Sequence, residues 1–113
     1  MNTKPPECWA LQPQARGLRV ELTPDHSFVV PYEHFIYSEY LDREGEEVLK
    51  LVFATHEIVL NGKLLRRVEA ALHKRELASV AAVAEKFRSV LEDTQPFIQE
   101  IAVISPTSAE EVK

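Results

Sequence analysis

The sequence predicts an α+β domain: a mainly antiparallel, twisted sheet of five to six strands with two helices, or one long bent helix, packed on it. Three observations predict it. Residues 32–60 read as two strand-forming runs around a glycine turn. Residues 62–93 place apolar side chains three and four apart, the spacing of amphipathic helices. Residues 97–104, FIQEIAVI, then read as a last strand. Strands, helices and a final strand in that order favour helices segregated to one face of the sheet.

Residues 1–16 are expected to form an irregular arm. Pro5, Pro6 and Pro13 lack the backbone N–H that a helix needs. Trp9 and Leu11 are the apolar exceptions, and a tryptophan brings enough apolar area to dock on the domain. A binding role for the Trp9 ring is the alternative. The single α+β domain is expected over residues 17–104.

Residues 17–31 predict the first of two consecutive hairpins. Leu18, Val20 and Leu22 alternate with charged residues, the period of a half-buried strand. Residues 23–26, Thr-Pro-Asp-His, predict the turn, because proline presets φ for its first central position. Pro31 cannot donate to a ladder, so the return strand ends or bends there.

Residues 32–60 predict the main hairpin and the short strand that follows it. Gly45 marks the turn, because glycine takes positive φ without a steric penalty. A two-residue turn at 44–45 pairs Arg43 with Glu46, and the register continues outward through three pairs: Glu39 with Lys50, Tyr37 with Val52 and Ile36 with Phe53. Extending it pairs Glu33 with His56. Opposite charges across strands stabilise this register by roughly 0.2–1 kcal/mol each. After a bend at 55–57, residues 58–60 form a short strand and Asn61-Gly62 closes the β region, with Asn61 as the N-cap of the next helix.

Residues 62–93 predict two amphipathic helices. The first apolar stripe comprises Leu64, Leu65, Val68, Ala71 and Leu72. The second comprises Val80, Val83, Ala84, Phe87, Val90 and Leu91, with Phe87 at its centre and buried against the sheet. Residues 73–76 interrupt the stripe without a glycine or proline, so one long bent helix remains the alternative. Pro96 ends the helical region, and residues 105–113 are expected to be a disordered tail.

Composition and motifs exclude several classes of function. The chain has 113 residues and a net charge of −5, which argues against a nucleic-acid protein. The single Cys8 permits no internal disulfide and fits the reducing cytoplasm, where we expect the protein to work. No apolar run is long enough to span a membrane. No nucleophile motif, glycine-rich phosphate loop or zinc spacing occurs, so no enzymatic activity and no cofactor are expected.

Two histidines are the candidates for a metal or small-ligand site on the sheet. His34 and His56 come close together at the open end of the main hairpin. In a register slipped by one residue they would share a face with carboxylates nearby, as metal ligands do. In the preferred register they point to opposite faces, and structural roles at the strand ends are expected instead.

Basic residues gather on and after the first predicted helix, within 13 positions: Lys63, Arg66, Arg67, Lys74 and Arg75. Such a patch could bind phosphates or an acidic partner. Glu69 and Glu76 balance the charges, and no aromatic residue interleaves with them, which weakens the case for nucleic acid.

The main hairpin is predicted to be apolar on both faces, and the helices can cover only one. One face carries Ile36, Tyr40, Leu49, Leu51 and Phe53. The other carries Phe35, Tyr37, Leu41, Val48, Val52 and Ala54. An uncovered patch of that size marks an interaction site. We therefore expect a small non-enzymatic binding domain with a protein partner, possibly a second copy in a two-fold homodimer, and interface residues Phe35, Tyr37, Val52 and Ala54.

Overall fold

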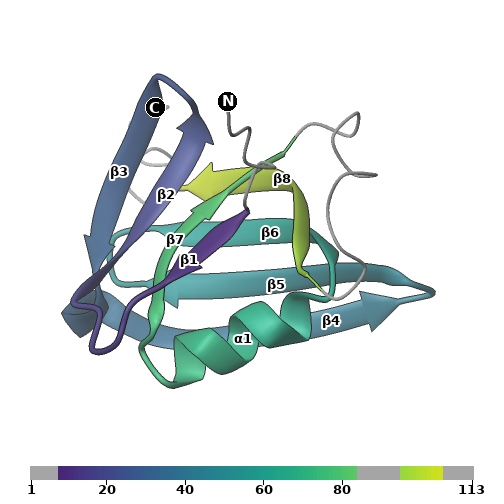
Figure 1. The fold of residues 1–113 in the computed structure, drawn as a ribbon, viewed down its shortest axis with the longest axis horizontal. Helices are drawn as coiled ribbons and strands as arrows, with labels where there is room; N and C mark the ends of the chain where they lie inside the picture. The colour runs from purple at the N-terminus through teal and green to yellow at the C-terminus, as the bar shows by residue number, and fades with distance from the viewer. Residues whose placement is uncertain (1–7, 84–94, 106–113) are drawn as a thin grey trace, which may run out of the picture.

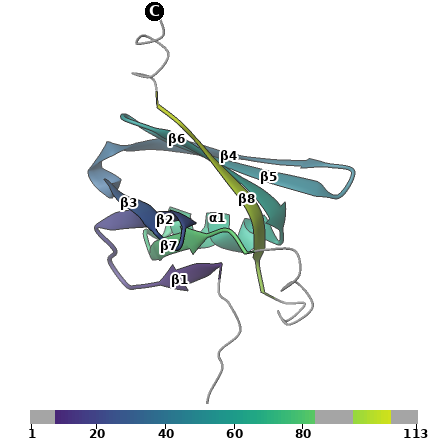
Figure 2. The same ribbon diagram turned by 90° about the horizontal axis from the view of Figure 1, so that it is seen from above.

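Two four-stranded β-sheets lie face to face in this chain, as the two views of the ribbon show (Figures 1 and 2). The computed structural model describes residues 8–83 and 95–105. The first sheet has the strand order β1-β7-β2-β3 and the second has the order β4-β5-β6-β8. A single α-helix, α1 (Leu65–His73), lies along one side of the sandwich beside β4 and β5 (Figure 1).

The strands of the first sheet come from two separate stretches of the chain, residues 9–31 and residues 77–81. They are β1 (Trp9–Leu11), β7 (Leu77–Ala81), β2 (Gly17–Thr23) and β3 (His26–Pro31). The β2 and β7 strands run parallel, and the other pairs of this sheet run antiparallel. The second sheet is antiparallel throughout and consists of β4 (Phe35–Arg43), β5 (Glu46–Phe53), β6 (Glu57–Lys63) and β8 (Phe97–Ile104). A 3₁₀ turn, η1 (Tyr32–His34), carries the chain from one sheet to the other.

The predicted α+β class, one sheet of five to six strands with two helices, is wrong. Of the described residues, 61% lie in strands and only 14% in helical turns, with two sheets and one α-helix. The extra sheet arises because two short segments pair that were not expected to be strands. Trp9–Leu11, within the expected irregular arm, pairs with Leu77–Ala81, within the expected helical region, and Leu77–Ala81 also pairs with β2.

The end of α1 explains why a second helix does not begin at once. Arg75 adopts a left-handed conformation with φ of 59°, and its N–H donates to the Leu72 carbonyl at 2.9 Å. The Glu76 N–H donates to the Ala71 carbonyl at 2.9 Å. These two bonds form a Schellman motif, which ends a helix and turns the chain away. Val80 therefore lies in β7, and Val83 is buried just after it, with its N–H donating to the Ile98 carbonyl at 2.9 Å. The other four residues of the second predicted stripe, Phe87 among them, lie outside the described residues, as does the predicted tail after Ser105.

The first predicted stripe does form the buried face of α1. Leu65, Val68, Ala71 and Leu72 are buried. The predicted N-cap, Asn61, is wrong, because Asn61 and Gly62 lie within β6. The cap comes instead from β5. One carboxylate oxygen of Glu47 accepts from the Leu64 N–H at 3.0 Å, and the other accepts from the Leu65 N–H at 2.8 Å.

The main hairpin has the predicted turn and most of the predicted register. Gly45 has φ of +90°, and the ladder runs from the Arg43/Glu46 pair to the Tyr37/Val52 pair as expected. A β-bulge then changes the register, so Phe53 pairs with Phe35 and not with Ile36. The predicted Ile36/Phe53 pair is therefore wrong. Because side chains alternate between faces, the bulge turns Phe35 inward and leaves Ile36 60% exposed.

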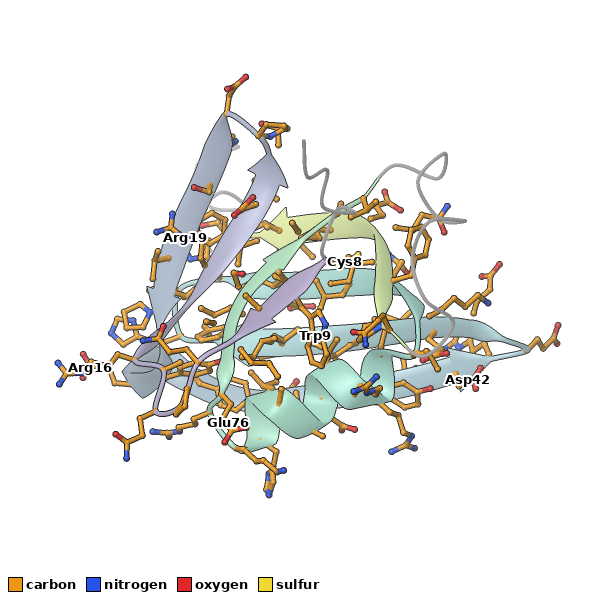
Figure 3. All side chains as sticks on the ribbon, viewed as in Figure 1. Cys8, Trp9, Arg16, Arg19, Asp42 and Glu76 are labelled. Carbon is orange, nitrogen blue, oxygen red and sulfur yellow. The ribbon has the colours of Figure 1, made fainter. Side chains whose placement is uncertain are left out.

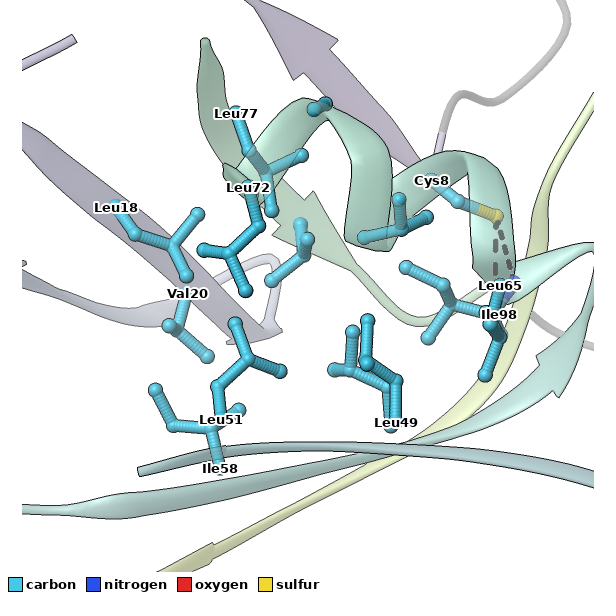
Figure 4. Packing of buried hydrophobic residues seen from close by; sticks show 14 of the residues in the cluster. Cys8, Leu18, Val20, Leu49, Leu51, Ile58, Leu65, Leu72, Leu77 and Ile98 are labelled. Atoms are coloured by element: carbon cyan, nitrogen blue, oxygen red, sulfur yellow. Dashed lines mark hydrogen bonds between the residues drawn. The ribbon is translucent and has the colours of Figure 1, made fainter. Parts of the chain in front are cut away.

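The hydrophobic core fills the space between the two sheets and α1 (Figure 4). Leu18 and Val20 of the first sheet face Leu49 and Leu51 of the second, and all four are fully buried. Gly62 permits the close approach of β8 to β6, because a Cβ there would lie 1.8 Å from the Phe97 carbonyl oxygen. The core thus accounts for the inner face of each sheet and leaves the two outer faces to solvent and partners.

Candidate functional site

The outer face of the β4-β5-β6-β8 sheet is the candidate site. The cross-strand register aligns its side chains in three rows. The first row contains Tyr37, Val52, Glu57 and Ile104. The second contains Glu39, Lys50, Val59 and Ala102. The third contains Leu41, Val48, Asn61 and Glu100. We call these twelve residues the outer face. The alternate residues of the same strands, such as Leu49, Leu51, Ile58 and Leu60, point into the core.

This face exposes large apolar side chains at its two edge strands. Tyr37 on β4 is 51% exposed and Ile104 on β8 is 52% exposed. Ile36, which the bulge turns outward beside Tyr37, is 60% exposed. Between the edges, Val48, Val52 and Val59 are half-buried by their neighbours. Half-buried valines at the centre and exposed large side chains at both edges place apolar surface on all four strands of this face.

Charged residues interrupt the apolar surface without dominating it. The Lys50 ammonium lies 3.5 Å from the Glu57 carboxylate, so these two central charges offset each other. Glu39 and Glu100 lie on the edge strands β4 and β8. The face therefore combines exposed apolar side chains at its edges with a charge pair at its centre, and such a mixture of apolar and polar groups is usual for surfaces that bind proteins reversibly.

The structure places the four predicted interface residues differently. Tyr37 and Val52 pair across the strands on the outer face, and Ala54 is exposed just beyond the end of β5. Phe35 does not belong to the group. Its ring packs 5.3 Å from the Phe53 ring and 6.4 Å from the Tyr32 ring, measured between centroids. The bulge at Ile36, which no local sequence signal marks, is the reason.

His34 and His56 do not form a metal centre with other ligands. The Nδ1 atom of His56 lies 2.9 Å from the Thr55 hydroxyl, and its ring packs 5.2 Å from the Phe28 ring. His34 is half-buried, and its backbone carbonyl accepts from the Ala54 N–H at 2.7 Å. Among residues 8–83 and 95–105, no group of three or more His, Cys, Asp or Glu side chains is placed to hold a metal ion.

The predicted basic residues differ in what their side chains contact. The Lys63 ammonium donates to the Gly45 carbonyl. The Arg66 guanidinium lies 4.3 Å above the Tyr40 ring and 3.6 Å from the Glu69 carboxylate. Arg67 lies 5.7 Å from the centroid of Trp9. Lys74 and Arg75 are exposed beyond the end of the helix. Three of the five cations thus contact other groups of the chain, and the five do not form one uniform patch.

Cys8 has no feature of a catalytic nucleophile. Its Sγ is buried and accepts from the Ile98 N–H at 3.2 Å (Figure 4). Burial raises the pKa of the thiol, and the hydrogen bond with Ile98 only partly opposes this. A thiol with a raised pKa is a poor source of the reactive thiolate. Cys8 therefore joins the start of the described chain to β8.

Sequence reasoning missed half of the outer face. Ile104 completes the row that Tyr37 and Val52 begin, and Val59 and Ala102 complete the row that Glu39 and Lys50 begin. Residues 97–104 were predicted to be a strand, but the sequence did not predict which strand lies beside it. Only the pairing of β8 with β6 shows that the two stretches share a surface.

No helix in the described part of the chain is long and apolar enough to cross a membrane. Comparisons with protein-family models, with curated proteins and with solved structures find no match to this chain. The fold and the site thus define its class by themselves: a small β protein whose described residues form two sheets and one α-helix, with exposed apolar side chains on one outer sheet face.

Proposed function

We propose that this protein is a small, non-enzymatic binding domain that acts in the cytoplasm through protein–protein contact at the outer face. The observation that carries the proposal is the exposure of Tyr37 and Ile104, 51% and 52%, at the two edges of one apolar sheet face. An antiparallel sheet with one wet face normally alternates apolar and polar residues cleanly. This sheet keeps apolar residues in all three outer rows.

The size of the face supports recognition of a protein. Four strands spaced about 4.8 Å apart, and three rows about 7 Å apart, give an area of roughly 400 Å². Patches of that size on soluble chains commonly mark interaction sites. Two such faces together bury on the order of 800 Å², which is below the roughly 1,200–2,000 Å² of stable interfaces and corresponds to a weak, transient contact. The expected contact is therefore reversible and of micromolar affinity.

A second copy of the chain is the partner we propose. We favour a two-fold axis that runs along the strands, because this axis stacks β4 on the β8 strand of the other copy and places exposed Tyr37 over exposed Ile104. Glu39 of one chain then lies opposite Ala102 of the other chain, and the two Glu39 carboxylates lie far apart. An axis across the strands would oppose Glu39 to itself and is disfavoured. An isologous interface of this kind closes a dimer.

Sedimentation tests the proposal directly. Wild type should change from the mass of one 12.9 kDa chain toward twice that mass between about 1 µM and about 100 µM, the range expected of a small interface. Tyr37→Glu should remain a single chain throughout. Val29→Glu is the matched control, because Val29 is 54% exposed on β3 of the other sheet. A wild type that stays at 12.9 kDa, or equal dissociation by both substitutions, would contradict the homodimer.

Two other functions receive less support. Small-ligand or metal binding at His34 and His56 is disfavoured because His56 already contacts Thr55 and Phe28. Nucleic-acid binding through the first helix is disfavoured because Arg66 and Arg67 lie over aromatic rings of the chain. The net charge of −5 adds a general repulsion toward phosphate backbones.

A further inference from the structure

The outer side of the other sheet, β1-β7-β2-β3, carries a groove of about 580 Å³. That volume lies within the range of small-molecule sites. Long polar side chains surround it: Gln12, Gln14, Arg16, Arg19 and Glu21. Its remaining lining consists of small or short residues, namely Ala15, Gly17, Val29, Ala78 and Ser79. The groove exists because short side chains cover its floor, and the long side chains at its border provide polar groups.

The wall of the groove is held in place by the backbone. The loop between β1 and β2 is tied to the turn after α1 by two hydrogen bonds. The Gln12 N–H donates to the Glu76 carbonyl at 2.8 Å, and the Ala15 N–H donates to the Arg75 carbonyl at 3.0 Å. A third bond runs from the Tyr32 N–H to the Arg16 carbonyl at 2.9 Å. A wall fixed in this way loses little conformational freedom when a ligand binds.

Two arginines of the groove have free guanidinium groups. Arg19 alternates with buried Leu18 and Val20, so it points outward, and its cross-strand neighbours are Val29 and Ser79. In the described part of the chain, neither Arg16 nor Arg19 has an ion-pair or hydrogen-bond partner for its side chain. Figure 3 shows both on the β2 side of the molecule, far from the Asp42 end of the β4–β5 hairpin. This contrasts with Arg66 and Arg67, which lie over aromatic rings.

We propose that this groove is a binding site for a small anionic molecule, whose carboxylate or phosphate group is held by Arg19, with Arg16 at the far border of the groove adding a second positive charge. The guanidinium fork matches both groups, because its parallel N–H bonds reach two oxygens of one anion. The amides of Gln12 and Gln14 can donate to further ligand oxygens. Half-buried Glu21 can accept from a hydroxyl or amine of the same ligand. The net charge of −5 makes two free arginines in one hollow a local exception to the charge of the whole chain.

Titration of the full chain followed by heteronuclear NMR tests the site, with inorganic phosphate in one arm and succinate in the other. Amide signals of Arg19 and Ser79 should shift saturably, with dissociation constants in the millimolar range expected for bare ions. Saturation by phosphate alone assigns a phosphorylated ligand, and saturation by succinate alone assigns a carboxylic acid. Saturation by both shows that the site accepts either anionic group.

The variants separate a specific site from general attraction by positive charge. Arg16→Gln with Arg19→Gln should weaken binding by at least about tenfold. Arg43→Gln with Lys74→Gln removes the same two charges from exposed positions outside the groove and should change affinity by less than about twofold. Tyr37→Glu lies on the opposite sheet and should leave anion binding unchanged, whether or not the chain dimerises. Absence of saturation up to about 50 mM, or equal losses in the two double variants, would overturn the proposal.

Discussion

The Tyr32 hydroxyl donates a hydrogen bond of 2.5 Å to the backbone carbonyl of Leu77. This contact joins the 3₁₀ turn between the two sheets to the first residue of β7. Tyr32 is only 3% exposed, and its ring packs against Phe35 and Phe53 of the second sheet. One side chain therefore ties together three parts of the fold that are distant in sequence.

Stability should decline above pH 10 because of Tyr32. Burial is the main cause that raises its pKa to about 12, and the nearby positive charge of Arg75 only partly opposes it. In the unfolded chain the phenol ionises near pH 10, so between pH 10 and pH 12 only the unfolded state releases the proton. The stabilisation is complete below pH 10 and is lost as the pH rises to 12, by up to roughly 2–3 kcal/mol. Urea unfolding at a series of pH values measures it.

Tyr32→Phe is the control for that titration. It removes the ionising group and leaves the Leu77 carbonyl without its donor, so we expect a loss of about 1–3 kcal/mol near neutral pH. The difference in stability between wild type and variant should then shrink from pH 10 to pH 12. A difference that stays constant over this range would show that Tyr32 does not carry the pH dependence.

Glu47→Ala should destabilise α1 and the whole fold by roughly 1–3 kcal/mol. Both oxygens of this carboxylate accept from backbone N–H groups at the start of α1, and one also accepts from the Tyr40 hydroxyl at 3.0 Å. Helices leave their first N–H groups without partners, and a negative charge there also favours the helix dipole. Chemical denaturation gives the loss, and hydrogen exchange should show faster opening of α1.

Glu46→Ala controls for the charge removed in that experiment. Glu46 is exposed and adjacent in sequence, and the change should be worth less than about 0.5 kcal/mol. Glu47→Gln keeps one oxygen acceptor and should fall between the two. Equal effects of Glu46→Ala and Glu47→Ala would contradict the capping role.

Arg75→Gly should stabilise the protein by about 0.5–1 kcal/mol. Arg75 occupies the left-handed position after α1 with φ of 59°, which is unfavourable for a residue with a Cβ and natural for glycine. The backbone bonds of the motif do not need the arginine side chain. Thermal or urea unfolding measures the gain.

Lys74→Gly is the matched comparison for this substitution. Lys74 has φ of −87° and ψ of −1°, a conformation that ordinary residues adopt readily. Glycine there should cost about 0.5–1 kcal/mol through the added freedom of the unfolded chain. If Arg75→Gly destabilises the protein as much as Lys74→Gly does, strain at Arg75 is not significant.

The parts of the fold that were predicted correctly have strong local signals. Gly45 between two strand-forming runs predicted the turn, and opposite charges at Arg43 and Glu46 predicted the register from there to Tyr37 and Val52. The spacing of Leu65, Val68 and Leu72 predicted the buried face of α1. In each case a turn residue or a periodic pattern within about ten positions is enough to select the structure.

The prediction errors arose where contacts with distant segments decide the secondary structure. Leu77–Ala81, with sequence LASVA, is short and fits a helix as well as a strand. It becomes β7 because Arg75 turns the chain and because β1 and β2 offer it two edges. No glycine marks the turn at Arg75, and the interruption of the apolar stripe at residues 73–76 signals the end of α1 without indicating that a strand follows.

The candidate sites follow the same division. The sequence by itself determined that the main hairpin has two apolar faces, and hence that one of them would remain uncovered by α1. Tertiary structure alone decided which residues form that face, because a one-residue bulge at Ile36 exchanges it with Phe35 and the pairing of β6 with β8 adds Val59 and Ile104. It also brought Arg16 and Arg19 into one groove with Gln12 and Ser79. The physical reason is that turns and periodicity are set by neighbouring residues, whereas sheet order and register are set by which distant strands bury each other's apolar side chains.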